Sequence, residues 1–194
     1  MLLGLITVVV MLGAAYAFWR QGVLAAIAMT VNVLLAGLIA FNFFEPMAAE
    51  LDPMFAGSIL HGYEDSICLV VPFVLSLLIL RWASNALIHT VIEYHPALQQ
   101  AGAAVFGSMA GYLTVGFLLT VAQTLPLDEH FLHFEPRIDP STPGAKIRHI
   151  LPPDRVWLAL MARASVDTFS WEGNAFDPDG SFESRYARER RIAD

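Results

Sequence analysis

Two histidines are the residues of this chain best placed to hold a metal ion. His130 and His133 lie three residues apart, and acidic residues flank them at Asp128, Glu129 and Glu135. On a helix, imidazoles one turn apart can share a divalent cation. A structural metal site, however, usually needs four ligands with fixed outer partners. The apolar residues of the same stretch also suit an interfacial segment that anchors the exit of a membrane helix. We therefore predict no bound metal and no cofactor.

The other candidate sites for catalysis are weaker. Ser58 and His61 lie close together, but they match neither a nucleophile elbow nor an HExxH helix. The stretch Asp177-Pro-Asp-Gly180 has its glycine fourth, not sixth as a calcium loop requires, so we predict a plain turn there. We predict that the protein is not an enzyme.

A third polar pattern lies in RWASNALIHTVIEYH, residues 81–95. Four polar side chains recur every fourth residue and would share one helix face: Arg81, Asn85, His89 and Glu93. They could line a polar route through a membrane, or they could form the wet side of an interfacial helix. The opposite face carries apolar residues such as Trp82 and Leu87, which favours the interfacial interpretation.

Composition indicates which elements position these residues. The chain is 56% hydrophobic and 15% charged, with a mean hydropathy of +0.56, which is too apolar for an ordinary soluble domain. Residues 1–126 hold eight Asp, Glu, Lys and Arg residues, whereas the last 68 residues hold 21. We therefore predict a four-span transmembrane domain over 1–125 and a polar tail over 126–194. The fold class is an all-α membrane protein with four transmembrane helices.

Four apolar segments are expected to cross the membrane. They cover residues 2–19, 23–44, about 67–92 and about 101–125. Arg20-Gln21-Gly22 makes the tight turn between the first two. Pro72 removes one backbone hydrogen bond from the third and is expected to kink it.

The basic residues give the orientation. In an antiparallel arrangement Arg20 and Arg81 share one side, and the opposite loop, 45–66, contains five acidic residues and no Lys or Arg. The positive-inside rule then places both arginines in the cytoplasm and both termini outside the cytoplasm.

The fourth segment carries a stripe of small residues. Ala103, Gly107 and Gly111 recur every four residues, with Gly116 further on. In lipid, such a stripe lets another helix backbone approach closely. The expected partner is a second copy of the chain or another membrane protein.

The stripe and its context resemble the colicin V production protein family. The resemblance covers about residues 1–125 and rests on Arg20 and Gly22 at the first turn, the acidic loop, and Phe106, Gly107 and Gly111 in register with the family motif. The chain departs from that motif at four positions, Gln99, Gln100, Ala103 and Ala110. The resemblance implies a divergent member of a family of small bacterial inner-membrane proteins linked to export or envelope maintenance.

The tail begins with a connector that holds six prolines between residues 126 and 153, which predicts an extended, semi-rigid segment. Asp154 is the expected N-cap of a helix through about Ser165. Trp157, Leu160 and Met161 lie on its apolar face. We expect this face to dock on the protein's own outer loop, the membrane surface or a partner, and a short basic helix to follow at 182–191.

These observations predict a non-enzymatic membrane scaffold or accessory subunit. Its expected partners are the lipid bilayer and membrane proteins, and nucleic acid is not expected. The alternative is a small transporter or channel subunit whose polar route passes Asn32, Asn42, Arg81 and His89.

Overall fold

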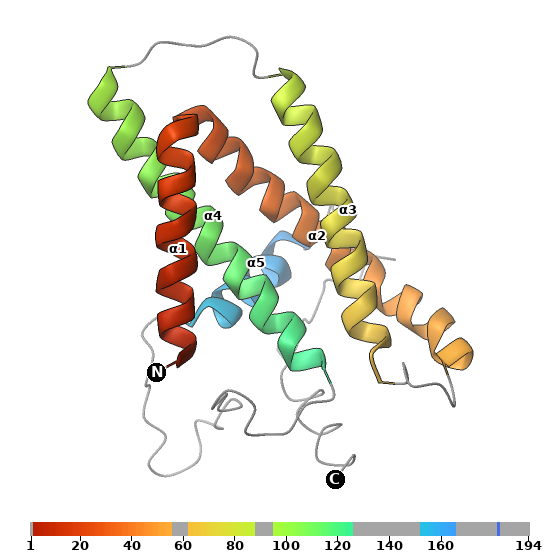
Figure 1. Ribbon diagram of the computed structural model, residues 1–194. Helices are drawn as coiled ribbons and strands as arrows, with labels where there is room; N and C mark the ends of the chain where they lie inside the picture. The colour runs from red at the N-terminus through yellow and green to blue at the C-terminus, as the bar shows by residue number, and fades with distance from the viewer. Residues whose placement is uncertain (1, 56–61, 88–94, 126–151, 166–181, 183–194) are drawn as a thin grey trace.

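Five helices make up the described part of the chain (Figure 1). The computed structural model describes residues 2–55, 62–87, 95–125, 152–165 and 182, with side chains from Leu5 onward. The helices are α1 (Leu2–Gln21), α2 (Val23–Phe55), α3 (Glu64–Leu87), α4 (Pro96–Thr124) and α5 (Pro153–Ala164). The described residues contain no β-strand. The all-α prediction is therefore confirmed for this part of the chain.

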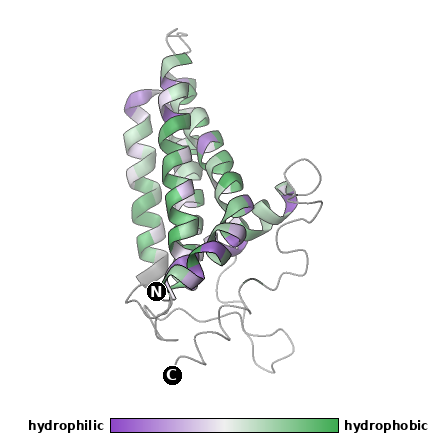
Figure 2. Cartoon of the chain, turned by 90° about the vertical axis from the view of Figure 1, so that its right-hand side faces the viewer, coloured by the Kyte–Doolittle hydropathy of each residue, from purple (hydrophilic) through white to green (hydrophobic). Residues whose placement is uncertain are grey.

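Three of the helices, α2, α3 and α4, are long and apolar enough to cross a membrane. The helix α1 is apolar as well, but its described side chains cover only Leu5–Gln21. Figure 2 shows hydrophobic residues along most of the length of the upright helices. The helices α1 and α3 run in one direction and α2 and α4 in the other, so the C-terminal ends of α1 and α3 lie at the same end of the bundle (Figure 1).

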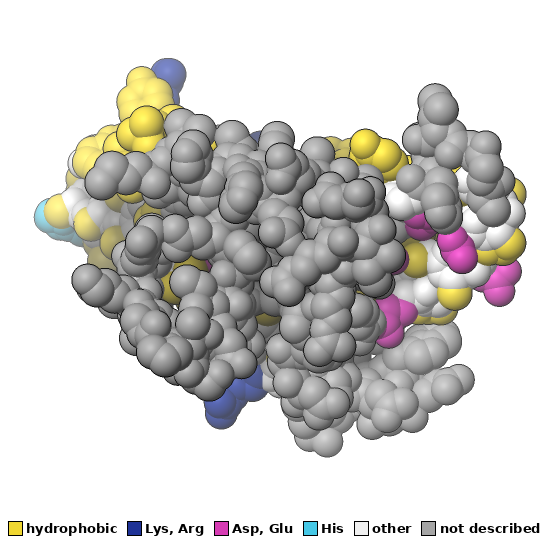
Figure 3. Space-filling model, turned by 90° about the horizontal axis from the view of Figure 1, so that it is seen from below, with side chains coloured by type: hydrophobic (Ala, Val, Ile, Leu, Met, Phe, Trp, Pro, Cys, Tyr) yellow, Lys and Arg dark blue, Asp and Glu magenta, His cyan; other side chains and the backbone are white. Residues whose placement is uncertain are grey.

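Two helix boundaries differ clearly from the sequence-based expectation. The helix α2 does not end near residue 44 but continues to Phe55, through Pro46 and Pro53. Good helix formers follow Pro46, and Ala48 is buried, so packing offsets the backbone hydrogen bonds that the prolines remove. The expected loop over 45–66 is thus largely helical. Figure 3 shows acidic side chains on one side of the molecule seen from below, and the acidic residues of this extension, Glu45, Glu50 and Asp52, are exposed.

The helix α4 begins at Pro96, five residues earlier than expected, and ends at Thr124. A proline suits the first turn of a helix, because its missing N–H would have no partner there. The helix α3 is described as far as Leu87, so the expected extension to residue 92 lies outside the described residues. The tail segments 126–151, 166–181 and 183–194 also lie outside them, and with the last of these most of the expected basic helix at 182–191.

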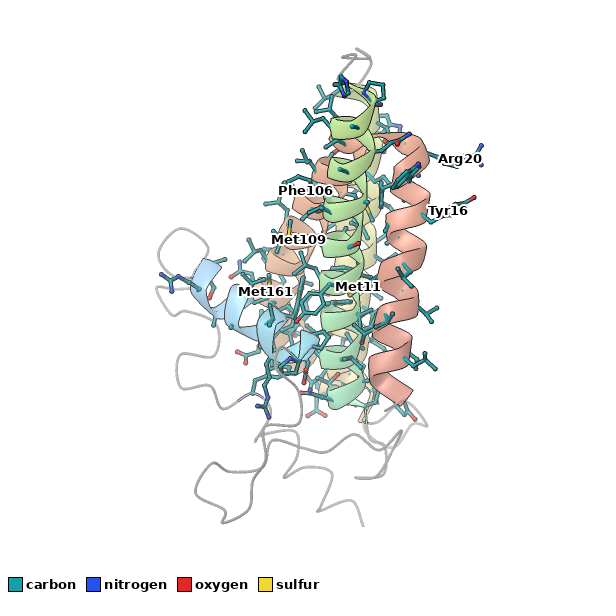
Figure 4. The ribbon with its side chains drawn as sticks, turned by 90° about the vertical axis from the view of Figure 1, so that its left-hand side faces the viewer. Met11, Tyr16, Arg20, Phe106, Met109 and Met161 are labelled. Atoms are coloured by element: carbon teal, nitrogen blue, oxygen red, sulfur yellow. The ribbon has the colours of Figure 1, made fainter. Side chains whose placement is uncertain are left out.

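The bundle is built from two close helix pairs, α1 with α4 and α2 with α3, and α2 also packs on α4. The main core lies where α2, α3, α4 and α5 meet, and Phe73 and Phe117 stack at its centre with ring centroids 3.7 Å apart. A smaller core of Phe18, Ala26 and Ala103 joins α1, α2 and α4. The helix α5 crosses the lower half of the bundle (Figure 4).

Candidate functional site

The turn between α1 and α2 consists of a single residue, Gly22. Its φ of 95° lies in the left-handed region, which favours glycine over residues with a side chain. The Gly22 N–H donates to the Phe18 carbonyl at 2.9 Å, which closes the end of α1 in the manner of an αL C-cap. Arg20 is exposed and points away from the bundle (Figure 4).

Gly107 and Gly111 lie where α4 meets α1 of the same chain. A Cβ atom at Gly107 would come within 3.1 Å of the Ala14 carbonyl oxygen and of the Ala15 Cα. At Gly111 it would come within 2.9 Å of the Ala14 Cβ. The two backbones therefore touch across this contact, as expected where small residues replace side chains in a helix interface.

The neighbouring residues Ala103 and Phe106 join the same interface. Ala103 is fully buried, and Phe106 packs on the small core. The Phe106 carbonyl accepts a hydrogen bond of 3.0 Å from the Thr30 hydroxyl of α2. The stripe on α4 therefore has its partners within one chain, on α1 and α2.

Gly116 belongs to a different contact, a groove between α2 and α4 that receives α5. A Cβ at Gly116 would lie 2.5 Å from the Pro153 carbonyl oxygen and 2.9 Å from the Trp157 Cβ. On α2, a Cβ at Gly37 would lie 2.3 Å from the Trp157 ring. Trp157 is fully buried, and its ring lies 5.8 Å from that of Phe117 and 6.3 Å from that of Phe41. We call this the α2–α4 groove; its residues are Gly37, Phe41, Phe44, Gly116 and Phe117.

A buried polar contact fixes the first turn of α5 in the groove. The Gln123 amide donates to the Asp154 carboxylate at 2.9 Å, and both side chains are buried. The amide oxygen of Gln123 and the indole N–H of Trp157 are also buried, and neither has a hydrogen-bond partner in the described part of the chain. The docked helix therefore leaves two polar atoms unpaired.

Two expectations about α5 are wrong. The helix begins at Pro153 with Pro152 as its N-cap, so Asp154 lies inside the first turn and its carboxylate binds Gln123. Leu160 is 38% exposed, whereas Leu158 is buried beside Trp157 and Met161. The docking face is rotated because the glycines at 37 and 116 centre the contact on Trp157.

The polar side chains inside the bundle pair with one another between helices. Asn32 of α2 donates its amide N–H to the Ser84 hydroxyl at 3.0 Å and accepts from that hydroxyl at 3.1 Å. Ser66 of α3 and Thr124 of α4 are joined by a hydrogen bond of 2.8 Å. These contacts hold α3 against α2 and α4.

Arg81 and Asn85 are both exposed on α3. Their expected companions on the same face, His89 and Glu93, lie outside the described residues. The candidate metal ligands His130 and His133, the pair Ser58 and His61, and the turn at Asp177 lie outside them too. Among the described residues, no group of three or more His, Cys, Asp and Glu side chains could hold a metal ion.

Sequence reasoning missed Gly37, Gln123 and Phe182. Phe182 is buried against the groove, with ring centroids 6.1 Å from Phe41 and 6.2 Å from Phe44. Gly37 gave the clearest signal, because a glycine in the middle of an apolar helix usually marks a close approach of another chain segment.

An antiparallel bundle of long apolar helices, closed by glycine contacts and interhelical hydrogen bonds, defines a helical membrane protein. Residues 3–136 match the family of the Colicin V production protein, and the chain belongs to that family. No curated protein and no solved structure matches the chain significantly. The family match contains α1 to α4 with the α2–α4 groove, whereas α5 lies beyond it.

Proposed function

We propose that this protein is a non-enzymatic scaffold or accessory subunit of the bacterial inner membrane, which acts in export or envelope maintenance. In this proposal α1 to α4 all cross the membrane. Both termini lie outside the cytoplasm, as the positive-inside rule predicts from Arg20 and Arg81. The partners are the bilayer and other membrane proteins or copies of the same chain. Membership of the Colicin V production protein family supports the link to export.

The observation that carries this proposal is the pairing of Asn32 with Ser84. Asn32 was one of the two residues of the second span, with Asn42, expected to line a polar route in a transporter. It is buried, and both ends of its amide are used in hydrogen bonds to one side chain of α3. A side chain used in this way joins α2 to α3, and one N–H and one oxygen lone pair of its amide are already engaged. This supports a scaffold over a transporter.

The experiment replaces both partners together, as Asn32→Leu with Ser84→Ala. Removing both polar groups leaves no unpaired buried atom, so the double variant should keep near-normal stability and full activity. The single variant Ser84→Ala leaves the Asn32 amide unpaired and should lose stability by about 1 kcal/mol.

Activity is measured by complementation of a strain that lacks the gene, at matched protein levels, and stability by thermal unfolding in mild detergent. An inactive double variant that accumulates and unfolds normally would contradict the scaffold and favour the transporter. Affinity purification from membranes in mild detergent, followed by mass spectrometry, would then identify the partner.

A further inference from the structure

The contact of α5 with the bundle has the features of a binding site for a helix. The site is formed by α2 and α4. They contact α5 through Gly37 and Gly116 and through the aromatic rings of Phe41 and Phe117. Its occupant supplies an acid in the first turn, a tryptophan three residues later and a methionine four residues after that. Asp154 binds Gln123, and Trp157 and Met161 both pack at Gly37.

The site and its occupant belong to separate parts of the chain. The groove lies within the segment that matches the family, and α5 lies beyond that segment. The helix α5 packs chiefly on α4 and, over a smaller area, on α2. The groove contacts that the structure describes are made by α2, α4, α5 and Phe182, and α5 from another copy could form the same contacts.

We propose that the α2–α4 groove is an exchangeable helix-binding site that accepts α5 from a second copy of this chain as well as its own. All contacts in the groove would be identical in the two arrangements. The free energies of the two arrangements therefore differ only through the entropy of the segment that joins α4 to α5 and the concentration of copies in the membrane. Exchange of identical segments is a low-cost route to a dimer.

Membrane geometry favours this exchange. A bilayer holds all copies in the same orientation and places their grooves at the same depth, which removes most of the search for the correct alignment. A stretch of the length of 126–151 can span up to about 85 Å when extended, and neighbouring bundles a few helices wide, at about 10 Å per helix, lie well within that distance. Within the described part of the chain, the Trp157 N–H and the Gln123 carbonyl oxygen have no hydrogen-bond partner, so release of α5 breaks no hydrogen bond at these two atoms.

The experiment uses two differently tagged full-length copies in one cell, both with Cys68→Ala. One copy carries Gln123→Cys and the other carries Asp154→Cys, since these two side chains are in contact when α5 is docked. A short bismaleimide is added to isolated membranes. Exchange predicts a crosslinked species that has the mass of two chains and carries both tags. Its yield should rise several-fold as expression increases.

Three controls make the outcome specific. A copy with Gly13→Cys, whose position on α1 has open space around it, measures random collisions with the Asp154→Cys copy. Adding Trp157→Ala to the Asp154→Cys copy should lower the two-tag yield several-fold, and Leu160→Ala, at an exposed position, should not.

A chain with both cysteines reports docking within one copy. If that chain crosslinks internally while the mixed copies give no more product than the Gly13 control, the exchange is refuted. If both Trp157→Ala and Leu160→Ala leave the two-tag yield unchanged, the groove is not the site.

Discussion

Single glycine residues decide how closely the helices of this protein approach. Gly107 and Gly111 bring the α4 backbone into contact with α1, and Gly37 and Gly116 make room for Trp157. In lipid, helices gain little from burying apolar surface, so association depends on close packing and on hydrogen bonds between helices. A side chain added at these positions therefore removes the main source of attraction.

Replacing Gly107 or Gly111 with Leu should destabilise the bundle. A Cβ alone would already lie 2.9–3.1 Å from α1 atoms, and several of these are backbone atoms that cannot move aside. Overpacking of this kind typically costs about 1–3 kcal/mol. Thermal unfolding in mild detergent measures the effect. Gly13→Leu is the matched control, because nothing lies within 4 Å of a Cβ there. Equal melting temperatures for the three variants would contradict the close contact.

At the scale of the element, α3 shows how one helix divides its surface. Its inner face pairs Ser84 with Asn32 and buries Phe73, while its outer face exposes apolar side chains such as Trp82 and Leu87, at 75% and 82%. Exposed apolar residues at such density would be unfavourable in water, and they suit contact with lipid or with neighbouring helices. The polar residue Arg81 is exposed near the same end, where it can reach the headgroups.

Placing an acid on this outer face should displace the end of α3. In Trp82→Asp or Leu87→Asp, a charge would enter apolar surroundings at a cost of up to about 3 kcal/mol, and abundance should fall.

His89→Gln should leave abundance and activity nearly unchanged, because we expect His89 on the wet side of an interfacial segment. Complementation at matched protein levels compares the variants. Loss of activity in a normally accumulating His89→Gln protein would instead favour the polar route.

At the scale of the whole molecule, the direction of the helices defines two ends. The Gly22 turn and the C-terminal end of α3 lie at one end, with Arg20 and Arg81. The acidic extension of α2 ends at Phe55, toward the opposite end of the bundle. This charge asymmetry is the basis of the proposed orientation.

Single-cysteine labelling measures that orientation in a Cys68→Ala background. Cysteines placed within 170–190 should react with a membrane-impermeant reagent in intact cells, or in spheroplasts where an outer membrane is present. Gln21→Cys should react only after the membrane is opened. The reverse pattern would place the positive end outside and refute the topology, because the basic residues would then lie on the wrong side.

The sequence by itself determined the family, the all-helical class and the apolar segments. These features depend on local composition: long apolar runs exclude a soluble domain, and Gly22 marks the turn because only glycine readily takes its positive φ. The predicted end of the second segment at residue 44 was wrong as the end of the helix, because the apolar run stops there but α2 continues to Phe55. The burial of Ala48 depends on neighbours that are distant in the sequence.

Only the tertiary structure decided which surfaces meet. Periodicity showed that α5 has an apolar face, but the orientation of that face is set by Gly37 and Gly116, which lie on two other helices. The pairing of Asn32 with Ser84 and of Gln123 with Asp154 likewise joins residues far apart in the chain. The physical reason is that a side chain's hydrogen-bond partner and its packing space are both supplied by other segments, so neither is encoded at the residue itself.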